Sequence, residues 1–222
     1  MGELYHLCNR SIGEAEIFSD KDEYERFRGA VRFYQINQPH ISFSNFISTQ
    51  ANRPGWVDWQ RFDENGKIVK IIAYCIMPTH FHIALSQTKE KGAEIFVNNL
   101  LNSYTRYYNI KHGRKGPLWQ GPTKKVLVEN DAQLLHLTRY INLNPVTAYL
   151  VNKPEDWSAS SYNEYLLMAS EADKICDCYR FLDMTPENYK KFVENGIEYQ
   201  RELAKIKKLS IISPTDPVNR PG

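Results

Sequence analysis

The stretch IVKIIAYCIMPTHFHIALS, residues 68–86, decides the fold of this chain. It holds two largely apolar runs, Ile68–Ile76 and His80–Ser86, and Met77-Pro78-Thr79 interrupts them. Runs of this length, bounded by a proline break, are typical of strands rather than helices. The stretch therefore predicts two strands of one sheet.

Further elements extend from this pair in both directions. Asp20 precedes a helical repeat of apolar residues and is the expected N-cap of its helix. Asn65-Gly66 is a hairpin signal. The remaining strands are expected at Tyr5–Asn9, Trp56–Phe62 and Lys124–Val128. The helices are expected at Lys21–Gln35, at Ala93–Lys111, from Asp131 as N-cap to a stop at Pro145, and from Pro186 to Leu209. This order predicts an α+β sandwich with a mostly antiparallel sheet.

Composition excludes several classes of protein. The chain has 222 residues, 42% of them hydrophobic and 24% charged, which is ordinary for a globular domain. No basic and apolar leader opens the sequence, and no run is long enough to cross a membrane. The four cysteines are scattered and fit neither a zinc finger nor a disulfide scaffold. We expect a cytoplasmic protein with no membrane partner.

Positive charge is concentrated in one segment of the sequence. The net charge is +2, but no acidic residue lies between Glu94 and Glu129, where six Lys and Arg residues occur. Subtracting these six from 28 leaves 22 basic against 26 acidic residues elsewhere. Aromatic residues are interleaved with these cations, and together the two types suit stacked bases and phosphates. The same pattern also fits a solvated face with part of its rings in the core.

His80 and His82 are the first candidates for chemistry. Residues two apart on a strand share a face, so both imidazoles leave the side opposite Phe81. Two neighbouring imidazoles are ready ligands for a divalent metal. Two polar residues on an exposed strand face would give the same pattern, and the pattern alone leaves both interpretations open.

The helix from Asp131 carries the second candidate. Gln133, His136, Tyr140 and Asn144 recur at spacings of three or four and form one polar ridge. A tyrosine on such a ridge can serve as a nucleophile, although on spacing alone an amphipathic helix with a half-buried tyrosine is the better explanation.

Five short motifs occur in a set order, and each is weak alone. They are YHLCNR at 5–10, MPTHFH at 77–82, GPLWQG at 116–121, RYINLNPV at 139–146 and WSASSY at 157–162. In this order they resemble the IS200-like (Y1) transposase superfamily, and in particular the REP-associated tyrosine transposases, over roughly residues 5–165.

The resemblance implies a ferredoxin-like sandwich and an HUH endonuclease. By position it implies Tyr140 as the nucleophile and His80, His82 and Asn144 as ligands of Mg²⁺ or Mn²⁺. It implies cleavage and transfer of single-stranded or hairpin DNA through a 5′-phosphotyrosine, by a monomer or a homodimer. Together with the basic segment, it gives the expected DNA-binding residues: Arg10, Arg106, Arg114, Lys115, Trp119, Gln120, Lys124 and Lys125.

Two departures from the family pattern concern DNA specificity: Pro122 follows Gly121 where a basic residue is common, and Asn142 stands where histidine is common. We expect residues 1–170 to form the catalytic domain and 171–222 a helical extension and tail. Alternative functions are a non-cleaving DNA-binding protein of the same fold, a metallohydrolase that activates water, and a structural domain.

Overall fold

Four antiparallel strands form the centre of the molecule. The computed structural model describes residues 2–37, 41–51, 66–170 and 173–212. The strands, β1 (Leu4–Arg10), β2 (Val69–Met77), β3 (His80–Gln87) and β4 (Lys124–Val128), lie in the order β2-β3-β1-β4, and every neighbouring pair is antiparallel. With a helical connection after β1 and another after β3, this order is the ferredoxin-like arrangement, so the predicted fold class is confirmed.

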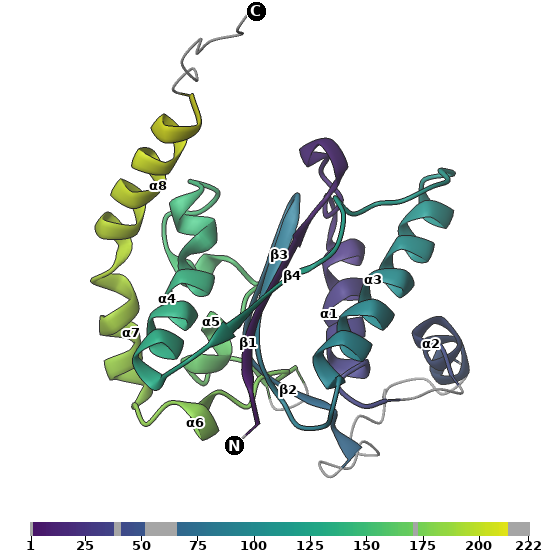
Figure 1. Cartoon of the computed structure of the whole chain (residues 1–222), viewed down its shortest axis with the longest axis horizontal. Helices are drawn as coiled ribbons and strands as arrows, with labels where there is room; N and C mark the ends of the chain where they lie inside the picture. The colour runs from purple at the N-terminus through teal and green to yellow at the C-terminus, as the bar shows by residue number, and fades with distance from the viewer. Residues whose placement is uncertain (1, 38–40, 52–65, 171–172, 213–222) are drawn as a thin grey trace, which may run out of the picture.

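Helices cover both faces of the sheet (Figure 1). On one face lie α1 (Lys21–Phe33), α2 (Phe43–Ala51) and α3 (Gly92–Lys111). The other face is covered by α4 (Asp131–Thr147), α5 (Tyr162–Tyr165), α6 (Cys178–Phe181), α7 (Pro186–Glu194) and α8 (Ile197–Ile212). Two single 3-10 turns, Ile12–Glu14 and Pro154–Asp156, complete the described elements.

Strand alternation divides the core in two. Phe81, Ile83 and Leu85 of β3 pack with α1 and α3, whereas Ala84 packs in the cluster beneath α4. Successive side chains of a strand point to opposite faces, so His80 and His82 lie on the α4 side of the sheet. The fold thereby directs both imidazoles toward the helix that carries Tyr140.

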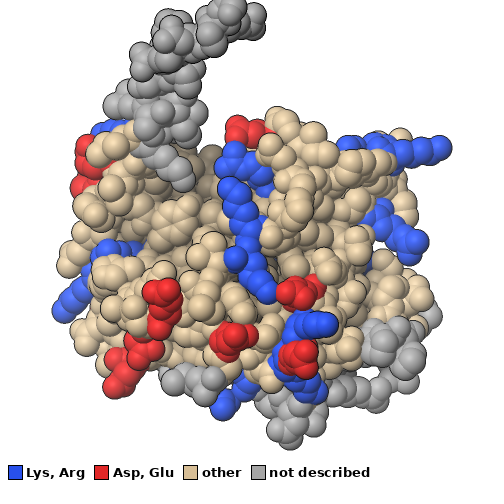
Figure 2. Space-filling model, viewed as in Figure 1, with Lys and Arg blue, Asp and Glu red and all other residues tan. Residues whose placement is uncertain are grey.

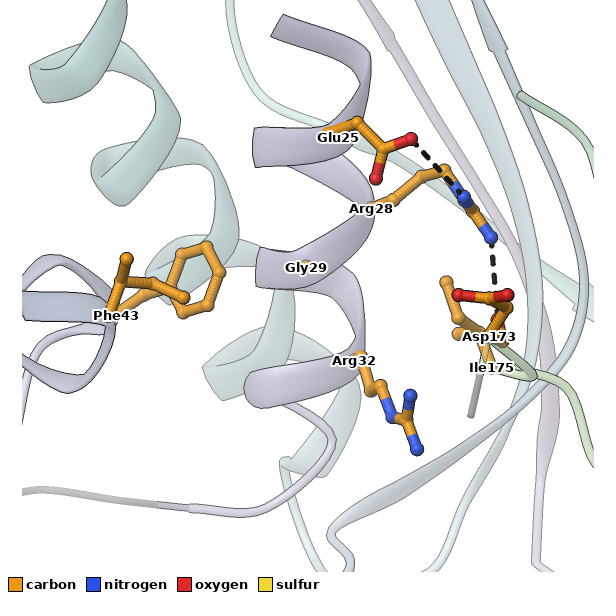
Figure 3. Close-up of a pocket in the computed structure, with 8 residues that line it drawn as sticks. Glu25, Arg28, Gly29, Arg32, Phe43, Asp173 and Ile175 are labelled. Atoms are coloured by element: carbon orange, nitrogen blue, oxygen red, sulfur yellow. Dashed lines mark hydrogen bonds and ion pairs between the residues drawn. The ribbon is translucent and has the colours of Figure 1, made fainter. Parts of the chain in front are cut away.

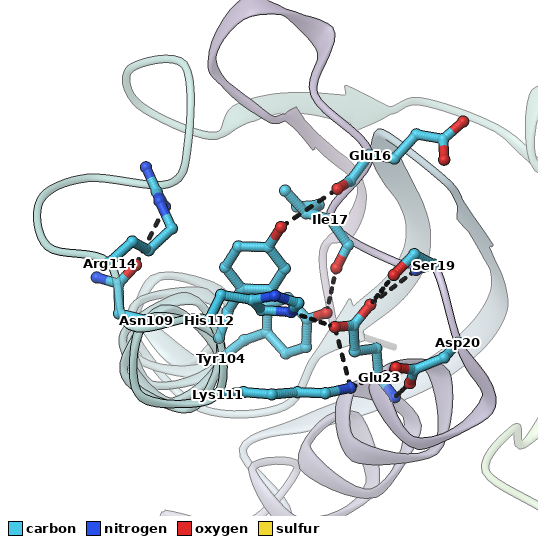
Figure 4. A network of polar contacts seen from close by, with 11 residues as sticks. Glu16, Ile17, Ser19, Asp20, Glu23, Tyr104, Asn109, Lys111, His112 and Arg114 are labelled. Atoms are coloured by element: carbon cyan, nitrogen blue, oxygen red, sulfur yellow. Dashed lines mark hydrogen bonds and ion pairs between the residues drawn. The ribbon is translucent and has the colours of Figure 1, made fainter.

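A buried carboxylate fixes α1 against α3 (Figure 4). Asp20 caps α1 as predicted, since its side chain accepts from the Glu23 backbone N–H. Glu23 is 0% exposed and accepts hydrogen bonds from the Ser19 backbone N–H and hydroxyl. Lys111 and His112 at the end of α3 contact its other oxygen at 3.1 and 2.6 Å. Glu23 is therefore the polar joint between the two helices.

The helices differ from the sequence expectations in α2, in the last predicted helix and in α4. The region after Pro39 has no clear period, yet it forms α2, because Phe43 and Phe46 pack on Phe33 with ring centroids 5.4 and 5.0 Å apart. Tertiary packing of this kind stabilises helices too short to form alone. The predicted final helix is two helices, α7 and α8, that meet at Asn195 and Gly196.

Helix α4 differs at both ends. Its N-cap is Asn130 rather than Asp131: the Asn130 side chain accepts from the Gln133 backbone N–H, and Gln133 in turn accepts from the Glu129 backbone N–H. The two hydrogen bonds resemble a capping box, except that Gln133 reaches the backbone N–H of the residue before the N-cap. The expected stop at Pro145 is wrong, because α4 continues to Thr147 with the proline inside it. The predicted strand Trp56–Phe62 and the hairpin signal at Asn65 lie outside the described residues.

Candidate active-site groove

A groove of about 700 Å³ opens on the α4 side of the sheet, across β1 and β3. It lies between the side chain of Tyr140 on α4 and the loop that leads into β4. Its lining residues are His6, Cys8, Asn9, Arg10, His80, His82, Gln120, Pro122, Lys124, Val126 and Tyr140. The groove therefore holds two imidazoles from the predicted site, the predicted nucleophile, and a third imidazole.

The three histidines are placed by the strand register. Cys8 of β1 lies directly opposite His82 of β3, and Arg10 lies opposite His80. His6 is two residues from Cys8 on the same face, and its Nε2 lies 3.0 Å from His82 Nδ1. The His80 and His82 ring centroids are 5.2 Å apart. Antiparallel pairing thus gathers residues that are more than 70 positions apart in sequence.

Burial keeps two of these imidazoles neutral. Loss of solvent lowers the pKa of His6 from 6.5 to about 4. It lowers the pKa of His80 to about 4 as well, with a further decrease from the positive charge of Arg10. A neutral imidazole has a nitrogen lone pair, which metal ligation and hydrogen-bond acceptance both require.

We predict that metal-free protein loses stability as the pH falls from about 7 to 4. In this window the unfolded chain, with an ordinary histidine pKa, binds protons that folded His6 and His80 do not, and this difference favours unfolding. The loss is at most about 3 kcal/mol for each histidine. Urea unfolding curves at a series of pH values measure it.

Two variants test whether this pH dependence comes from the buried histidines of the groove. His6→Gln should reduce the slope of stability against pH, because one of the two shifted groups is gone. His136→Gln removes an exposed histidine of α4 and is the matched control. Equal slopes in wild type and His6→Gln would contradict the prediction.

Tyr140 projects from α4 into the groove and is 38% exposed. Its ring is nearly perpendicular to that of His82, with centroids 5.4 Å apart, and lies 6.3 Å from that of His6. Burial raises the pKa of its phenol, whereas Arg10 and the Asn144 amide lower it in part. The phenol is therefore protonated at neutral pH and must lose its proton when it acts as a nucleophile.

Side-chain hydrogen bonds of Asn144 explain why α4 continues through Pro145. Pro145 has no backbone N–H to give to the Ile141 carbonyl, and a proline inside a helix normally breaks it. The Asn144 Nδ2 group donates to the Ile141 carbonyl at 3.3 Å and to the Tyr140 carbonyl at 2.8 Å. The Tyr140 carbonyl also accepts from Gln200 of α8 at 3.1 Å. This bonding holds the turn of α4 that presents Tyr140.

His136, one turn before Tyr140, points elsewhere. Its Nδ1 contacts Arg139 at 2.9 Å and its ring lies against Phe192 of α7. It is not among the lining residues of the groove. Of the four residues of the polar ridge, only Tyr140 is among the lining residues of the groove; Gln133 and the predicted metal ligand Asn144, like His136, are not.

The predicted DNA-binding residues are also divided between the two sides of the sheet. Arg10, Gln120 and Lys124 line the groove, and Figure 2 shows Lys and Arg side chains in a line between the two helical layers. Lys125, the next residue of β4, points to the other face and pairs with Glu94 at 2.7 Å. Arg106 lines a separate pocket on α3.

Other members of the predicted DNA-binding set lie in the loop after α3. Arg114 donates to the Asn109 side chain and the Pro117 carbonyl, and Lys115 is exposed. Trp119 is 9% exposed, and its indole N–H donates to Thr105. Its ring packs among Phe18, Phe27, Phe81 and Tyr104. An enclosed ring cannot stack a base, so Trp119 is a core residue rather than a DNA contact.

Another pocket, of about 190 Å³, lies by α1 and α2, on the far side of the sheet (Figure 3). Arg28 reaches across it to the Tyr74 hydroxyl at 3.2 Å and the Asp173 carbonyl at 3.3 Å. No histidine, cysteine or tyrosine is among its described lining residues. Its described lining residues therefore offer no imidazole, thiol or phenol.

Two residues of the groove, His6 and Cys8, were not predicted as site residues. With His82 they offer three ligand atoms that all lie within 4.8 Å of one another. The available signal was the alternation of His6, Cys8 and Arg10 along the first strand, which places all three on one face. Sequence alone could not tell that this face meets that of His82.

No family model and no curated protein sequence matches the chain. Among solved structures, the chain is similar to a REP-associated tyrosine transposase bound to a REP hairpin, with a TM-score of 0.49 and 16% identity. The alignment covers 83% of this chain and 90% of the other. Within the described residues, no helix is long and apolar enough to cross a membrane.

Proposed function

We propose that this chain is a metal-dependent endonuclease and strand transferase for single-stranded DNA, of the HUH tyrosine transposase type. The observation that carries the proposal is the position of Tyr140, whose ring lies against His82 in a groove also lined by His80. A phenol beside paired imidazoles and cations suits attack on a phosphodiester. The order of the five sequence motifs supports the same family.

The residues present fit a divalent cation. His80 and His82 leave one strand face into a groove, and the lowered pKa of His80 leaves its imidazole neutral at physiological pH. We propose that these two residues hold Mg²⁺ or Mn²⁺, with the side-chain oxygen of Asn144 as a third ligand, since its nitrogen is used within α4. Such an ion would polarise the scissile phosphate.

The chain's own side chains carry the remaining chemistry. Arg10 of β1 and Lys124 of the neighbouring strand β4, which both line the groove, contact the phosphates that flank the cleaved bond. The Tyr140 phenol oxygen forms a bond to phosphorus as the bond from phosphorus to the 3′ oxygen breaks. The phenol proton passes to solvent, and the departing 3′ oxygen takes up a proton. The products are a 5′-phosphotyrosine and a free 3′-hydroxyl.

The covalent product explains why transfer needs no nucleotide triphosphate. The phosphotyrosine is itself a phosphodiester, so attack by a 3′-hydroxyl reverses the reaction and joins strands. We propose a hairpin of the REP or transposon-end type as substrate. Residues 1–170 then form the catalytic domain, and 171–222 an extension that supports α4 through contacts such as Gln200 to Tyr140.

A denaturing gel tests the proposal. Purified protein is mixed with a labelled library of single-stranded hairpins in Mn²⁺ or in EDTA. A metal-dependent band of protein covalently joined to DNA is expected. Cleavage without an adduct would indicate a metallohydrolase, and binding without cleavage would indicate a non-cleaving DNA-binding protein. Either result would contradict the proposal.

The lining of the groove also predicts which basic side chains contact DNA. Lys124→Ala should weaken binding of every hairpin to a similar degree, because phosphate contacts carry no sequence information. The slope of log affinity against log salt should fall by about 0.7, the value for one phosphate contact on a single strand. Fluorescence anisotropy at several salt concentrations measures both quantities.

Arg106→Ala is the matched control, since it removes an equal charge from the α3 face. We expect it to leave affinity and salt slope unchanged. A loss in Arg106→Ala equal to that in Lys124→Ala would place the DNA on the other side of the sheet and contradict the groove as the binding surface.

A further inference from the structure

We propose that His6, Cys8 and His82 form a second metal site, selective for zinc and similar borderline-soft ions, whose occupation inhibits the groove. The three ligand atoms, two nitrogens and one sulfur, all lie within 4.8 Å of one another. In a tetrahedral zinc site, ligand atoms are about 3.3–3.8 Å apart. Small side-chain rotations therefore bring all three onto one ion.

The sheet makes this arrangement rigid. His6 and Cys8 lie two apart on β1, and Cys8 is directly opposite His82 on β3. The 3.0 Å contact from His6 Nε2 to His82 Nδ1 shows that the two imidazoles already face each other through their nitrogens. Paired strands hold the Cβ atoms of opposite residues about 5 Å apart. A metal would replace the hydrogen bond without a change in the backbone.

Ligand type determines which ion binds. The Cys8 thiolate distinguishes this site from the proposed catalytic site, because a thiolate ligand favours Zn²⁺ and Co²⁺ over Mg²⁺ and Mn²⁺. On binding, the Cys8 thiol releases its proton to solvent, and the thiolate neutralises one of the two charges of the ion. That neutralisation matters in a groove that Arg10 and Lys124 make positive.

The two sites compete for His82. A neutral imidazole has a single nitrogen able to ligate, because the other carries a proton. When His82 binds zinc beside His6 and Cys8, it cannot also serve a hard ion beside His80. Zinc is therefore expected to inhibit Mn²⁺-supported cleavage. Formation of the zinc site itself requires no DNA and no cleavage, so it does not depend on the proposed function.

Cobalt absorption spectroscopy tests the site directly. Titration of metal-free protein with Co²⁺ should give a near-ultraviolet thiolate-to-cobalt charge-transfer band that saturates at one equivalent. Cys8→Ser should abolish the band and weaken Zn²⁺ binding at least about 100-fold, since even outer-shell partners of a metal contribute about 10–100-fold. His6→Ala should weaken Zn²⁺ binding to a similar degree.

Cys75→Ala is the matched control. Cys75 lies opposite His82 on β2 as Cys8 does on β1, but burial raises the pKa of its thiol and its sulfur contacts Met77. The band should persist in Cys75→Ala, and also in His80→Ala, which lacks a ligand of the proposed catalytic ion. Circular dichroism and urea unfolding check that each variant is folded.

The outcomes separate this inference from the proposed function. Absence of the band in wild type, or its persistence in folded Cys8→Ser, would overturn the zinc site whether or not the protein cleaves DNA. A charge-transfer band in a protein that never cleaves DNA would support the zinc site and contradict only the proposed endonuclease function. In active protein, the zinc concentration that halves cleavage should rise at least about tenfold in Cys8→Ser, measured against that variant's own zinc-free rate.

Discussion

Tyr140→Phe is expected to abolish the covalent protein–DNA adduct and to lower cleavage by at least about 10⁴-fold, the order of loss on removal of a covalent nucleophile. The variant keeps the ring that lies 5.4 Å from His82 and removes only the hydroxyl. Because phosphate contacts come from other side chains, hairpin affinity should change less than about threefold. The denaturing gel measures adduct formation, and anisotropy measures affinity.

Tyr149→Phe is the matched control for this prediction. Tyr149 lies just beyond the end of the same helix and is 62% exposed, and its ring faces Arg201 rather than the groove. Adduct formation should be unchanged in this variant. An adduct that persists in Tyr140→Phe would mean that another tyrosine is the nucleophile. Tyr104, Tyr107 and Tyr108 would then be tested, although all three lie on α3 behind the sheet.

Glu23→Gln is expected to lower the free energy of unfolding by about 2–4 kcal/mol, because it breaks a buried, charge-assisted network. The pKa of Glu23 reflects that network: burial raises it, but hydrogen bonds from Ser19, His112 and Lys111 outweigh burial and leave it below its usual value. The carboxylate therefore contributes stability above its ordinary pKa, and that contribution is lost as the pH falls through the folded value.

Urea unfolding at pH 7 measures the effect of Glu23→Gln. Glu25→Gln on the same helix is the control, since Glu25 is more than half exposed and lies 3.9 Å from its partner Arg28. Its effect should remain within about 0.5 kcal/mol. A loss below about 1 kcal/mol in Glu23→Gln would show that the joint between α1 and α3 depends on apolar packing alone.

Local periodicity was sufficient for most elements of this fold. The alternation from His80 to Leu85 predicted a strand with two imidazoles on one face, and the structure has that strand. Asp20 was predicted as a helix cap and is one. Such signals are contained in a few neighbouring residues, whose side chains and backbone bonds are fixed within one turn or one strand.

The helix through Pro145 was not predictable in this way. A proline ordinarily ends a helix, and the sequence around it gave the ordinary expectation. The structure retains the helix because the Asn144 side chain donates to the Ile141 carbonyl and α8 supplies Gln200 to the Tyr140 carbonyl. One of these partners is 60 positions away, outside any local window.

By itself, the sequence determined the strands, the main helices and the separate candidates His80, His82 and Tyr140. Only the tertiary structure decided that His6 and Cys8 lie beside His82, that Lys124 and Lys125 serve opposite sides of the sheet, and that Trp119 is a core residue. The reason is physical: a side chain's face follows from its own strand, whereas its neighbours follow from the register between strands. That register is set by the packing of two whole faces of apolar side chains.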